Sequence, residues 1–196
     1  TAAGKTGLAL ALARALGGEL IGADSVQVYQ GFDIGSAKPA AGELGQVKHH
    51  LLDVARPDEH VDAARFAELA DAAIALTWSR HKVPIVVGGA GLWLRALLRG
   101  LVNVPPVDQN LRDKLAEELR QIGSAAMHAK LTLIDPLAAN AIHPNDALRI
   151  TRALEVHAQT GIPLGELRAS HALGSDRYPT CRIALGPRRE LLRDRI

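Results

Sequence analysis

The sequence is poor in cysteine and aromatic residues, and it lacks long apolar runs. Its one cysteine, Cys181, excludes a disulfide within the chain and is typical of a reducing compartment, so we expect a cytoplasmic protein. We interpret this cysteine as a buried apolar side chain and not as a nucleophile. No apolar run approaches membrane-spanning length and no signal peptide is visible, which predicts no association with a membrane.

The charge of the chain is nearly balanced. A formal net charge of +2 over 196 residues is too small to indicate a nucleic-acid partner by itself. The segment 149–196 is richer in basic residues and contains arginine but no lysine. Such a segment either binds a phosphate backbone or forms a solvated helix face, and the sequence leaves both open. The length allows one large domain or a core with an insertion.

The first six residues, Thr-Ala-Ala-Gly-Lys-Thr, match the second half of a phosphate-binding P-loop. Apolar residues at helical spacing follow them, so Lys5 and the free amides would lie at the positive end of a helix. A phosphate is stabilised there, and the hydroxyl of Thr6 can hold magnesium. The predicted phosphate-binding residues are Thr1, Ala2, Ala3, Gly4, Lys5 and Thr6. The first half of the motif and an initiator methionine are absent, so we expect a fragment of a longer protein.

Helix and strand patterns alternate through the first half of the chain. The first helix stops at Gly17-Gly18, and the patterns then predict a strand at 19–23, a polar loop at 25–39, a strand at 50–54, a helix at 62–80 and a buried parallel strand at 84–87. The face that the helix at 62–80 would bury consists of Phe66, Leu69, Ala73, Leu76 and Thr77. The alternation predicts an α/β fold with a P-loop NTPase-like parallel sheet flanked by helices.

From Pro105-Pro106 onward the pattern changes to consecutive helices, predicted at 108–121, 124–134, 136–142 and 147–160. Because no strand pattern separates them, we predict an inserted all-helical subdomain over 105–179. A strand at 181–185 and a helix from Arg188 would then return to the core. The core comprises 1–104 and 180–196, and we expect its first strand and its C-terminal part to lie outside this chain.

Two loops would meet the phosphate site at the carboxyl ends of the strands, where α/β sheets bind ligands. Asp24-Ser25 ends the strand at 19–23, and Asp24 is either a catalytic or magnesium-binding carboxylate or a cap of the following turn. The second loop is Gly88-Gly89-Ala90-Gly91. Its amides either approach a second phosphate or the substrate, or its glycines serve tight packing.

Several motifs in collinear order carry a resemblance to a known family. Besides the P-loop half, they are Asp24–Tyr29, Asp33–Pro39, His49–Asp53, Val86–Gly89, His143–Asp146 and Arg149–Glu155. Together they span nearly the whole chain, and they resemble the tRNA dimethylallyltransferases, also called tRNA isopentenyltransferases. These enzymes modify the adenosine just 3′ of certain anticodons.

The resemblance implies an enzyme that moves the dimethylallyl group from dimethylallyl diphosphate to the exocyclic amine of that adenosine. The P-loop half would then bind pyrophosphate, with magnesium on Thr6 as the cofactor. Lys5 and the loop amides would stabilise the departing pyrophosphate, and Asp24 would accept the proton of the amine. The base must be turned out of its stack for this. The implied partners are tRNA and dimethylallyl diphosphate, and we expect a monomer.

The resemblance also implies contacts with tRNA. The implied residues are Asp24, Ser25, Val26, Gln27, Ala90, Arg112, Leu148, Arg149, Ile150, Thr151 and Arg152. Arg149 and Arg152 are three residues apart and would share one helix face, while Ile150 and Leu154 would point to the core. Sequence alone favours a solvated residue at Arg112.

The chain departs from the family at two points. The family usually has a threonine at Ala90 and a tyrosine at Trp93, so one pyrophosphate-binding hydroxyl is absent. The chain also stops before the distal basic segment of the family. None of the histidines has metal-ligand spacing, so we predict no zinc site and interpret His49 and His50 as structural.

Other functions remain compatible with the same residues. In a small-molecule kinase the P-loop would hold ATP and Asp24 would activate a hydroxyl. A nucleotide-binding switch would use the P-loop without transfer chemistry. A prenyltransferase that acts on free adenine nucleotides is the nearest rival.

Overall fold

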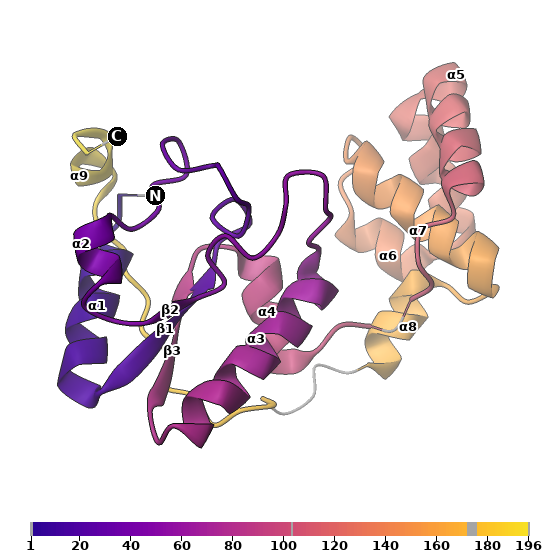
Figure 1. Cartoon of the computed structure of the whole chain (residues 1–196). Helices are drawn as coiled ribbons and strands as arrows, with labels where there is room; N and C mark the ends of the chain where they lie inside the picture. Colours follow the sequence, from indigo (N-terminus) through magenta and orange to yellow (C-terminus); the bar gives the residue numbers. More distant parts are fainter. Residues whose placement is uncertain (1, 103, 172–175, 196) are drawn as a thin grey trace. The chain divides into compact units, whose positions relative to one another are not determined.

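The computed structural model describes residues 2–102, 104–171 and 176–195, and it divides the chain into two compact units. One unit comprises Thr1–Gly100 with Ser175–Ile196 and contains a sheet, whereas the described part of the other, Leu101–Gly174, is helical (Figure 1). The α/β fold is therefore confirmed. The boundaries differ by a few residues from those predicted at 105 and 179. No helix of the described residues is long and apolar enough to cross a membrane.

The sheet of the α/β unit has three parallel strands, β1 (Gly18–Ala23), β2 (His49–His50) and β3 (Val83–Gly88), in the order β2-β1-β3. Residues along the central strand β1 alternate between its faces. Leu20 packs in the core cluster with α1 (Lys5–Leu16), whereas the neighbouring Glu19 reaches Thr77 of α3 (Ala63–Ser79). Because successive strand residues point to opposite faces, the two helices cover opposite sides of the sheet (Figure 1).

The helices of this unit begin and end with recognisable local chemistry. Helix α1 ends where Gly17 adopts a left-handed conformation, with φ of 61°, which glycine reaches without strain. Helix α3 begins after Asp62, whose carboxylate accepts a hydrogen bond from the Arg65 amide at 2.8 Å. The remaining helices of the unit are α2 (Ala41–Leu44), α4 (Gly91–Arg99) and α9 (Arg189–Arg193). Of these, the sequence reading missed α2 and predicted α9.

Two strand predictions need correction in extent or burial. The strand predicted at 50–54 stops at His50, because Leu51 and Asp53 have φ values of 61° and 54°, which lie outside the extended region. The strand at 84–87 exists and is parallel, but it is only half-buried. It lies at an edge of the described sheet, so one of its sides has no neighbouring strand.

The face of α3 is also shifted from the prediction. Leu76 is exposed and Leu69 only partly buried. The buried residues are Ala63, Phe66, Ala70, Ala73, Ile74 and Thr77.

The strand predicted at 181–185 is wrong, because this segment forms neither strand nor helix, and its Ile183 side chain is exposed. Cys181 is also exposed, contrary to expectation. The segment is tied to α3 just before this point. Arg177 donates to Asp71 at 2.7 Å, and the Tyr178 hydroxyl donates to the same carboxylate at 2.6 Å. Burial and that hydrogen bond raise the pKa of Tyr178 to about 12.

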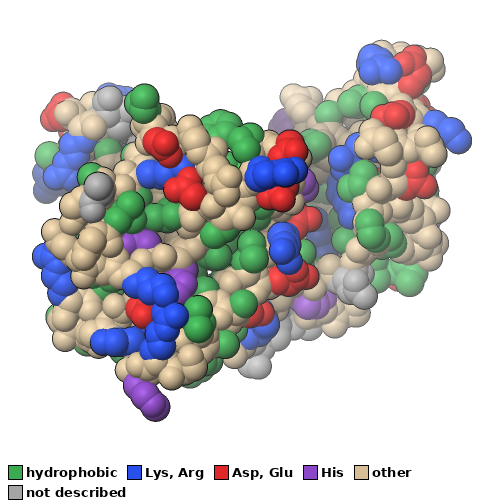
Figure 2. All heavy atoms as spheres, in the orientation of Figure 1, with side chains coloured by type: hydrophobic (Ala, Val, Ile, Leu, Met, Phe, Trp, Pro, Cys, Tyr) green, Lys and Arg blue, Asp and Glu red, His purple; other side chains and the backbone are tan. Residues whose placement is uncertain are grey.

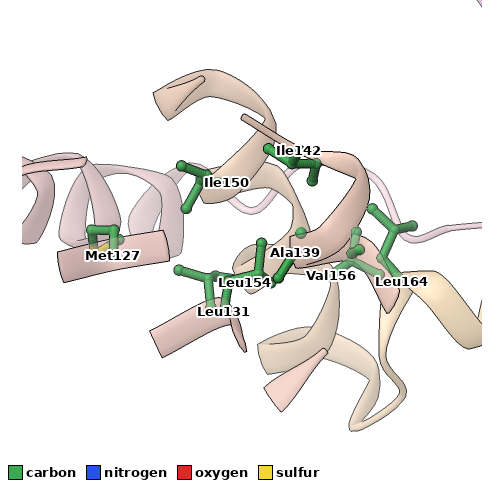
Figure 3. Close-up of a cluster of buried hydrophobic side chains, with 10 residues drawn as sticks. Met127, Leu131, Ala139, Ile142, Ile150, Leu154, Val156 and Leu164 are labelled. Atoms are coloured by element: carbon green, nitrogen blue, oxygen red, sulfur yellow. The ribbon is translucent and has the colours of Figure 1, made fainter. Parts of the chain in front are cut away.

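The helical unit contains α5 (Gln109–Ile134), α6 (Pro136–Ala141), α7 (Ala147–Thr160) and α8 (Leu164–Ser170). Gly123, with φ of 80°, interrupts α5 and separates the two helices that the sequence predicts there. Helix α8 was not predicted. The core of this unit is apolar (Figure 3), and its most deeply buried side chains include Met127, Leu131, Ile150 and Val156.

A buried carboxylate joins the sheet to α3. Glu19 on β1 lies 2.6 Å from His50 Nε2 and 3.3 Å from Arg80 Nη1, and Thr77 donates to it at 3.5 Å. Burial by itself would raise the pKa of Glu19, but the hydrogen bonds from His50 and Arg80 hold it below its ordinary value of 4.5. His50 is thus part of the packing between sheet and helix.

This lowered pKa predicts an acid-sensitive contribution to stability. A carboxylate with a lowered folded-state pKa stabilises the fold above its unfolded pKa, and the stabilisation is lost as the pH falls through the folded value. We expect the unfolding free energy of the wild type to fall between about pH 6 and about pH 3 more steeply than that of Glu19→Gln. Denaturant titrations at each pH measure this. The exposed carboxylate variant Glu68→Gln should keep the wild-type slope, and equal slopes for all three proteins would disprove the assignment.

Candidate functional site

A cavity of about 620 Å³ lies at the carboxyl ends of β1 and β3, where the sequence predicts the ligand to bind. Four segments line it, namely residues 2–6, 24–27, 36–37 and 89–90. The structure therefore brings together the P-loop half, the loop after β1 and the loop after β3, all of which belong to the α/β unit. Thr1, also predicted to bind phosphate, lies outside the described residues.

The N-terminus of α1 presents backbone amides at this cavity. Gly4 precedes the helix with φ of 84°, and Ala2 also has a positive φ, 58°, so the chain turns sharply into the helix. No side chain caps this end and no acidic residue lies in the first turn. Among the described residues nothing accepts the amide protons of Lys5 or Thr6. An uncapped helix N-terminus of this kind attracts anions.

The ammonium group of Lys5 is unpaired within the described residues. It makes neither an ion pair nor a hydrogen bond there, although the side chain is half-buried. It extends past Gly89, where a β-carbon would lie 3.8 Å from Nζ. A lysine left unpaired beside the positive end of a helix makes this side of the cavity strongly attractive to a phosphate group.

Asp24 has one carboxylate oxygen bound within the following turn and one without a partner among the described residues. Its Oδ1 accepts hydrogen bonds from the amides of Val26 at 2.9 Å and Gln27 at 3.3 Å, so this oxygen caps the turn. Its Oδ2 accepts no hydrogen bond from the described residues, and the carboxylate lines the cavity beside Lys5 and Thr6. One oxygen thus fixes the side chain while the other is available for a proton or a cation.

The loop that follows Asp24 is held by two partly buried side chains, Gln27 and Lys38. Gln27 Nε2 donates to the carbonyls of Ser36 at 2.9 Å and Ala37 at 3.0 Å. Burial alone would lower the pKa of Lys38, but ion pairs with Asp33 at 2.8 Å and Asp53 at 2.6 Å raise it. These contacts hold the loop whose residues Ser36 and Ala37 line the cavity.

The sequence reading did not assign Ser36 and Ala37 to the site, and it gave Lys38 no role. The signal was present in the Asp33–Pro39 motif, which it used only as a mark of resemblance. In the structure Ser36 and Ala37 of this motif line the cavity, and Lys38 anchors the loop that carries them.

The residues at the end of β3 and in the loop after it serve different purposes. A β-carbon on Gly88 would lie 2.0 Å from the Ala23 carbonyl oxygen, so close strand pairing requires glycine there. Gly89 and Ala90 line the cavity. Ala90 also precedes α4 as its N-cap residue and offers no side-chain cap. Trp93 is buried and stacks on Phe66 with ring centroids 4.6 Å apart, which makes it a packing residue.

A second, smaller cavity of about 60 Å³ shares Lys5, Thr6, Asp24 and Gln27 with the first. His49 lines it, and its Nδ1 lies 2.7 Å from the Val47 carbonyl, so this nitrogen carries the ring proton. No group of three His, Cys, Asp or Glu side chains in the described residues is arranged to hold a metal ion.

The other predicted tRNA-contacting residues belong to the helical unit and differ in exposure. Leu148 and Arg149 on α7 are exposed, and Arg149 pairs with Asp146 at 3.2 Å. Ile150 is completely buried, as its spacing predicts, and its side chain packs in the core of the helical unit. Thr151 donates its hydroxyl to the Ala147 carbonyl within the helix. Figure 2 shows Lys and Arg side chains lying among Asp and Glu side chains on the face it presents, without one continuous basic patch.

Arg112 and Arg152 both lie beside the buried carboxylate of Glu155. Arg112 is half-exposed, but it faces the buried carboxylate of Glu155 at 3.7 Å. Arg152 lies 3.1 Å from the same carboxylate and is mostly buried, unlike Arg149 on the neighbouring turn. The sequence reading missed Glu155, although it closes the Arg149–Glu155 motif.

Comparisons with known proteins add a second line of argument. The sequence model of the IPP transferase family matches residues 27–196. The tRNA dimethylallyltransferases of Anaeromyxobacter dehalogenans (strain 2CP-1) and Anaeromyxobacter sp. (strain Fw109-5) are 54% and 56% identical over the whole chain. The chain spans 64% and 65% of the length of these curated relatives.

Two solved structures are also similar. A full-length tRNA isopentenylpyrophosphate transferase from Bacillus halodurans is 42% identical with a TM-score of 0.51, over 83% of this chain and 54% of that one. A eukaryotic dimethylallyltransferase described as acting on tRNA is 29% identical with a TM-score of 0.72, over 87% of this chain and 42% of that one.

Proposed function

The chain belongs to the IPP transferase family, and from this premise we propose that the protein moves a dimethylallyl group from dimethylallyl diphosphate to tRNA. The acceptor is the exocyclic amine of the adenosine 3′ of the anticodon. The proposal rests on one observation. Groups that can bind a diphosphate and a group that can accept a proton line the same cavity, and none of them has a partner among the described residues. The ammonium of Lys5 and the amides at the start of α1 suit a diphosphate, and Asp24 Oδ2 suits a proton.

The proposed reaction is a displacement at the allylic carbon. The amine nitrogen forms a bond to that carbon, the bond from carbon to the diphosphate oxygen breaks, and the diphosphate leaves with the electron pair. Lys5 and the α1 amides stabilise the negative charge that grows on the leaving oxygen. Asp24 Oδ2 takes the proton that the nitrogen loses, while Oδ1 keeps the carboxylate in place through Val26 and Gln27.

The residues present fit a magnesium ion. Magnesium keeps several waters and is usually held by one or two protein oxygens together with substrate phosphates, so it does not need a cage of protein ligands. Thr6 lines the cavity, and its hydroxyl would supply such an oxygen. When bound, the ion would neutralise part of the charge on the diphosphate.

For tRNA we propose contacts on both units. In the α/β unit the exposed backbone and side chains of Ser25 and Val26 border the cavity beside Asp24. In the helical unit Arg112, Leu148 and Arg149 are exposed enough to meet tRNA. A cytoplasmic location follows from the proposed substrate.

A transfer assay with parallel acceptors tests this proposal. The full-length protein is given labelled dimethylallyl diphosphate and magnesium, with tRNA, AMP or ATP in separate reactions. We expect label in tRNA only. Label in AMP or ATP would instead identify a prenyltransferase of free nucleotides. Protection and turnover of ATP without transfer of label would identify a kinase.

Ala90 predicts a specific gain of function. By family resemblance a threonine here can donate a hydrogen bond to the oxygen that joins the allyl group to diphosphate, and that oxygen gains charge in the transition state. We therefore expect Ala90→Thr to raise the single-turnover rate with saturating tRNA by roughly ten-fold, the scale of one hydrogen bond of about 1.4 kcal/mol.

The structure supplies the control for this variant. Because Ala90 is the uncapped N-cap residue of α4, a threonine would also stabilise the helix by about 1 kcal/mol. Ala90→Val has the same shape without the hydroxyl and should raise neither rate nor stability. If Ala90→Thr becomes more stable with an unchanged rate, the hydroxyl caps α4 and is dispensable for transfer.

A further inference from the structure

We propose that Glu155 is a positioning residue that holds the guanidinium of Arg112 in place for tRNA, with Arg152 as its internal counter-charge. This inference rests on the proposed function, because it concerns how the helical unit would meet the RNA backbone. Nothing in the sequence pattern alone gives Glu155 this role.

The buried carboxylate of Glu155 lies between the guanidinium groups of Arg152 and Arg112. Arg152 Nη2 donates to the Pro105 carbonyl at 3.0 Å, and Arg152 Nη1 lies 3.1 Å from Glu155 Oε1. Glu155 Oε2 lies 3.7 Å from Arg112 Nη2. The exposed side-chain fraction is 2% for Glu155, 27% for Arg152 and 45% for Arg112, so Arg112 is the more exposed of the two arginines.

Packing does not explain a glutamate at this position. The neighbours of Glu155 on α7, Leu154 and Val156, are both buried apolar residues. A buried ion pair is often replaced by apolar residues without loss of stability, because removing the charges from water costs as much as their attraction returns. A charged group kept at such a site is better explained by what it orients.

The net charge of the Arg112–Glu155–Arg152 cluster also favours a role at the surface. Two guanidinium groups share one carboxylate, so the cluster retains one positive charge. Arg152 cannot present its charge to a ligand easily, because its Nη1 is buried and its Nη2 is bonded to Pro105. The remaining charge is therefore offered by Arg112, whose guanidinium is held on its inner side by Glu155. This corrects the expectation that Arg112 is a freely solvated residue.

Removing the negative charge of Glu155 tests this role, because the inference and net charge alone predict opposite changes in tRNA affinity. Glu155→Gln removes a negative charge, and by net charge alone the variant should bind tRNA more tightly. If Glu155 positions Arg112, affinity should instead fall by about ten-fold, and the slope of log K against log salt should flatten by up to about one. Filter or fluorescence binding of tRNA at several salt concentrations measures both.

Glu117→Gln is the matched control. Glu117 lies on α5, the same helix as Arg112, and pairs at the surface with Arg120. The control removes the same charge from the same unit and should bind tRNA as tightly as the wild type or slightly more tightly. Equal affinities for Glu155→Gln and Glu117→Gln would overturn the inference.

A double-mutant cycle separates positioning from folding. If Glu155 acts through Arg112, then Arg112→Ala combined with Glu155→Gln should bind no more weakly than Arg112→Ala alone. Additive losses would overturn the inference.

Should Glu155→Gln fold poorly, the variant Glu155→Met with Arg152→Met replaces the buried pair by apolar side chains and should stay folded. Wild-type affinity in that variant would also contradict the role. A wild type that binds no tRNA would refute the proposed function itself, whereas the other failures refute only this inference.

Discussion

Replacing Lys5 with alanine is expected to lower the transfer rate by about 100- to 1,000-fold without unfolding the protein, the scale observed when one preorganised donor to a developing anion is removed. The ammonium of Lys5 has no partner among the described residues, so its removal leaves no buried group unpaired. Alanine is also favourable at the first residue of α1. Single-turnover transfer to tRNA, together with thermal unfolding, measures both parts of the prediction.

The matched control for Lys5 is Lys48→Ala. Lys48 is an exposed lysine of the same unit, and its side chain does not line the cavity. This variant should retain the wild-type rate, which excludes an effect of net charge alone. A wild-type rate for Lys5→Ala would remove the N-terminus of α1 from the mechanism.

Asp24→Asn is expected to lower the rate by about 100- to 10,000-fold while tRNA affinity stays near normal. Asparagine cannot accept the proton of the amine. Its side-chain oxygen can still accept the hydrogen bonds from Val26 and Gln27, so the turn should persist. Transfer rate at saturating substrates and tRNA affinity are measured separately.

Asp24→Ala distinguishes the two oxygens of this residue. Alanine removes the cap of the turn as well as the base, so this variant should lose tRNA affinity in addition to rate. The difference between the alanine and asparagine variants then reports the structural role of Oδ1. If Asp24→Asn loses affinity but keeps its single-turnover rate, Asp24 is a binding residue and not the base.

The parts of the fold that sequence could predict are those that depend on local patterns. Helix α1 and its end at Gly17 follow from apolar spacing and a glycine stop, and α3 follows from the Asp62 cap and a long amphipathic run. Strand β1 is also recognisable from its local sequence pattern. These signals act within a few residues, so they survive without knowledge of tertiary contacts.

The errors arise where distant contacts decide. The apolar residues at 181–185 resemble a strand, but this segment pairs with no strand of the described sheet. The segment is instead fixed by Arg177 and Tyr178 on Asp71, a contact across more than a hundred residues. The strand at 50–54 ends early for a backbone reason, the positive φ of Leu51, which no apolar pattern reveals.

In the candidate site, too, local motifs were predictable and features that depend on distant contacts were not. The motifs pointed to Lys5, Thr6, Asp24 and Ala90, and the structure brings these residues to one cavity. Sequence could not show that Asp24 divides its oxygens between a turn and the cavity, because that depends on the path of the loop after β1. It could not show the burial of Glu155 either, because a glutamate on a helix ordinarily faces solvent.

Nucleoside analysis of tRNA tests the central claim most directly. The full-length protein is incubated with unmodified tRNA, magnesium and labelled dimethylallyl diphosphate, and the tRNA is then digested and separated by mass. The account predicts one labelled nucleoside, adenosine carrying the dimethylallyl group on its exocyclic amine, from the position 3′ of the anticodon, and almost none from Lys5→Ala or Asp24→Asn. Label on another atom or another nucleoside, or undiminished label from both variants, would contradict it.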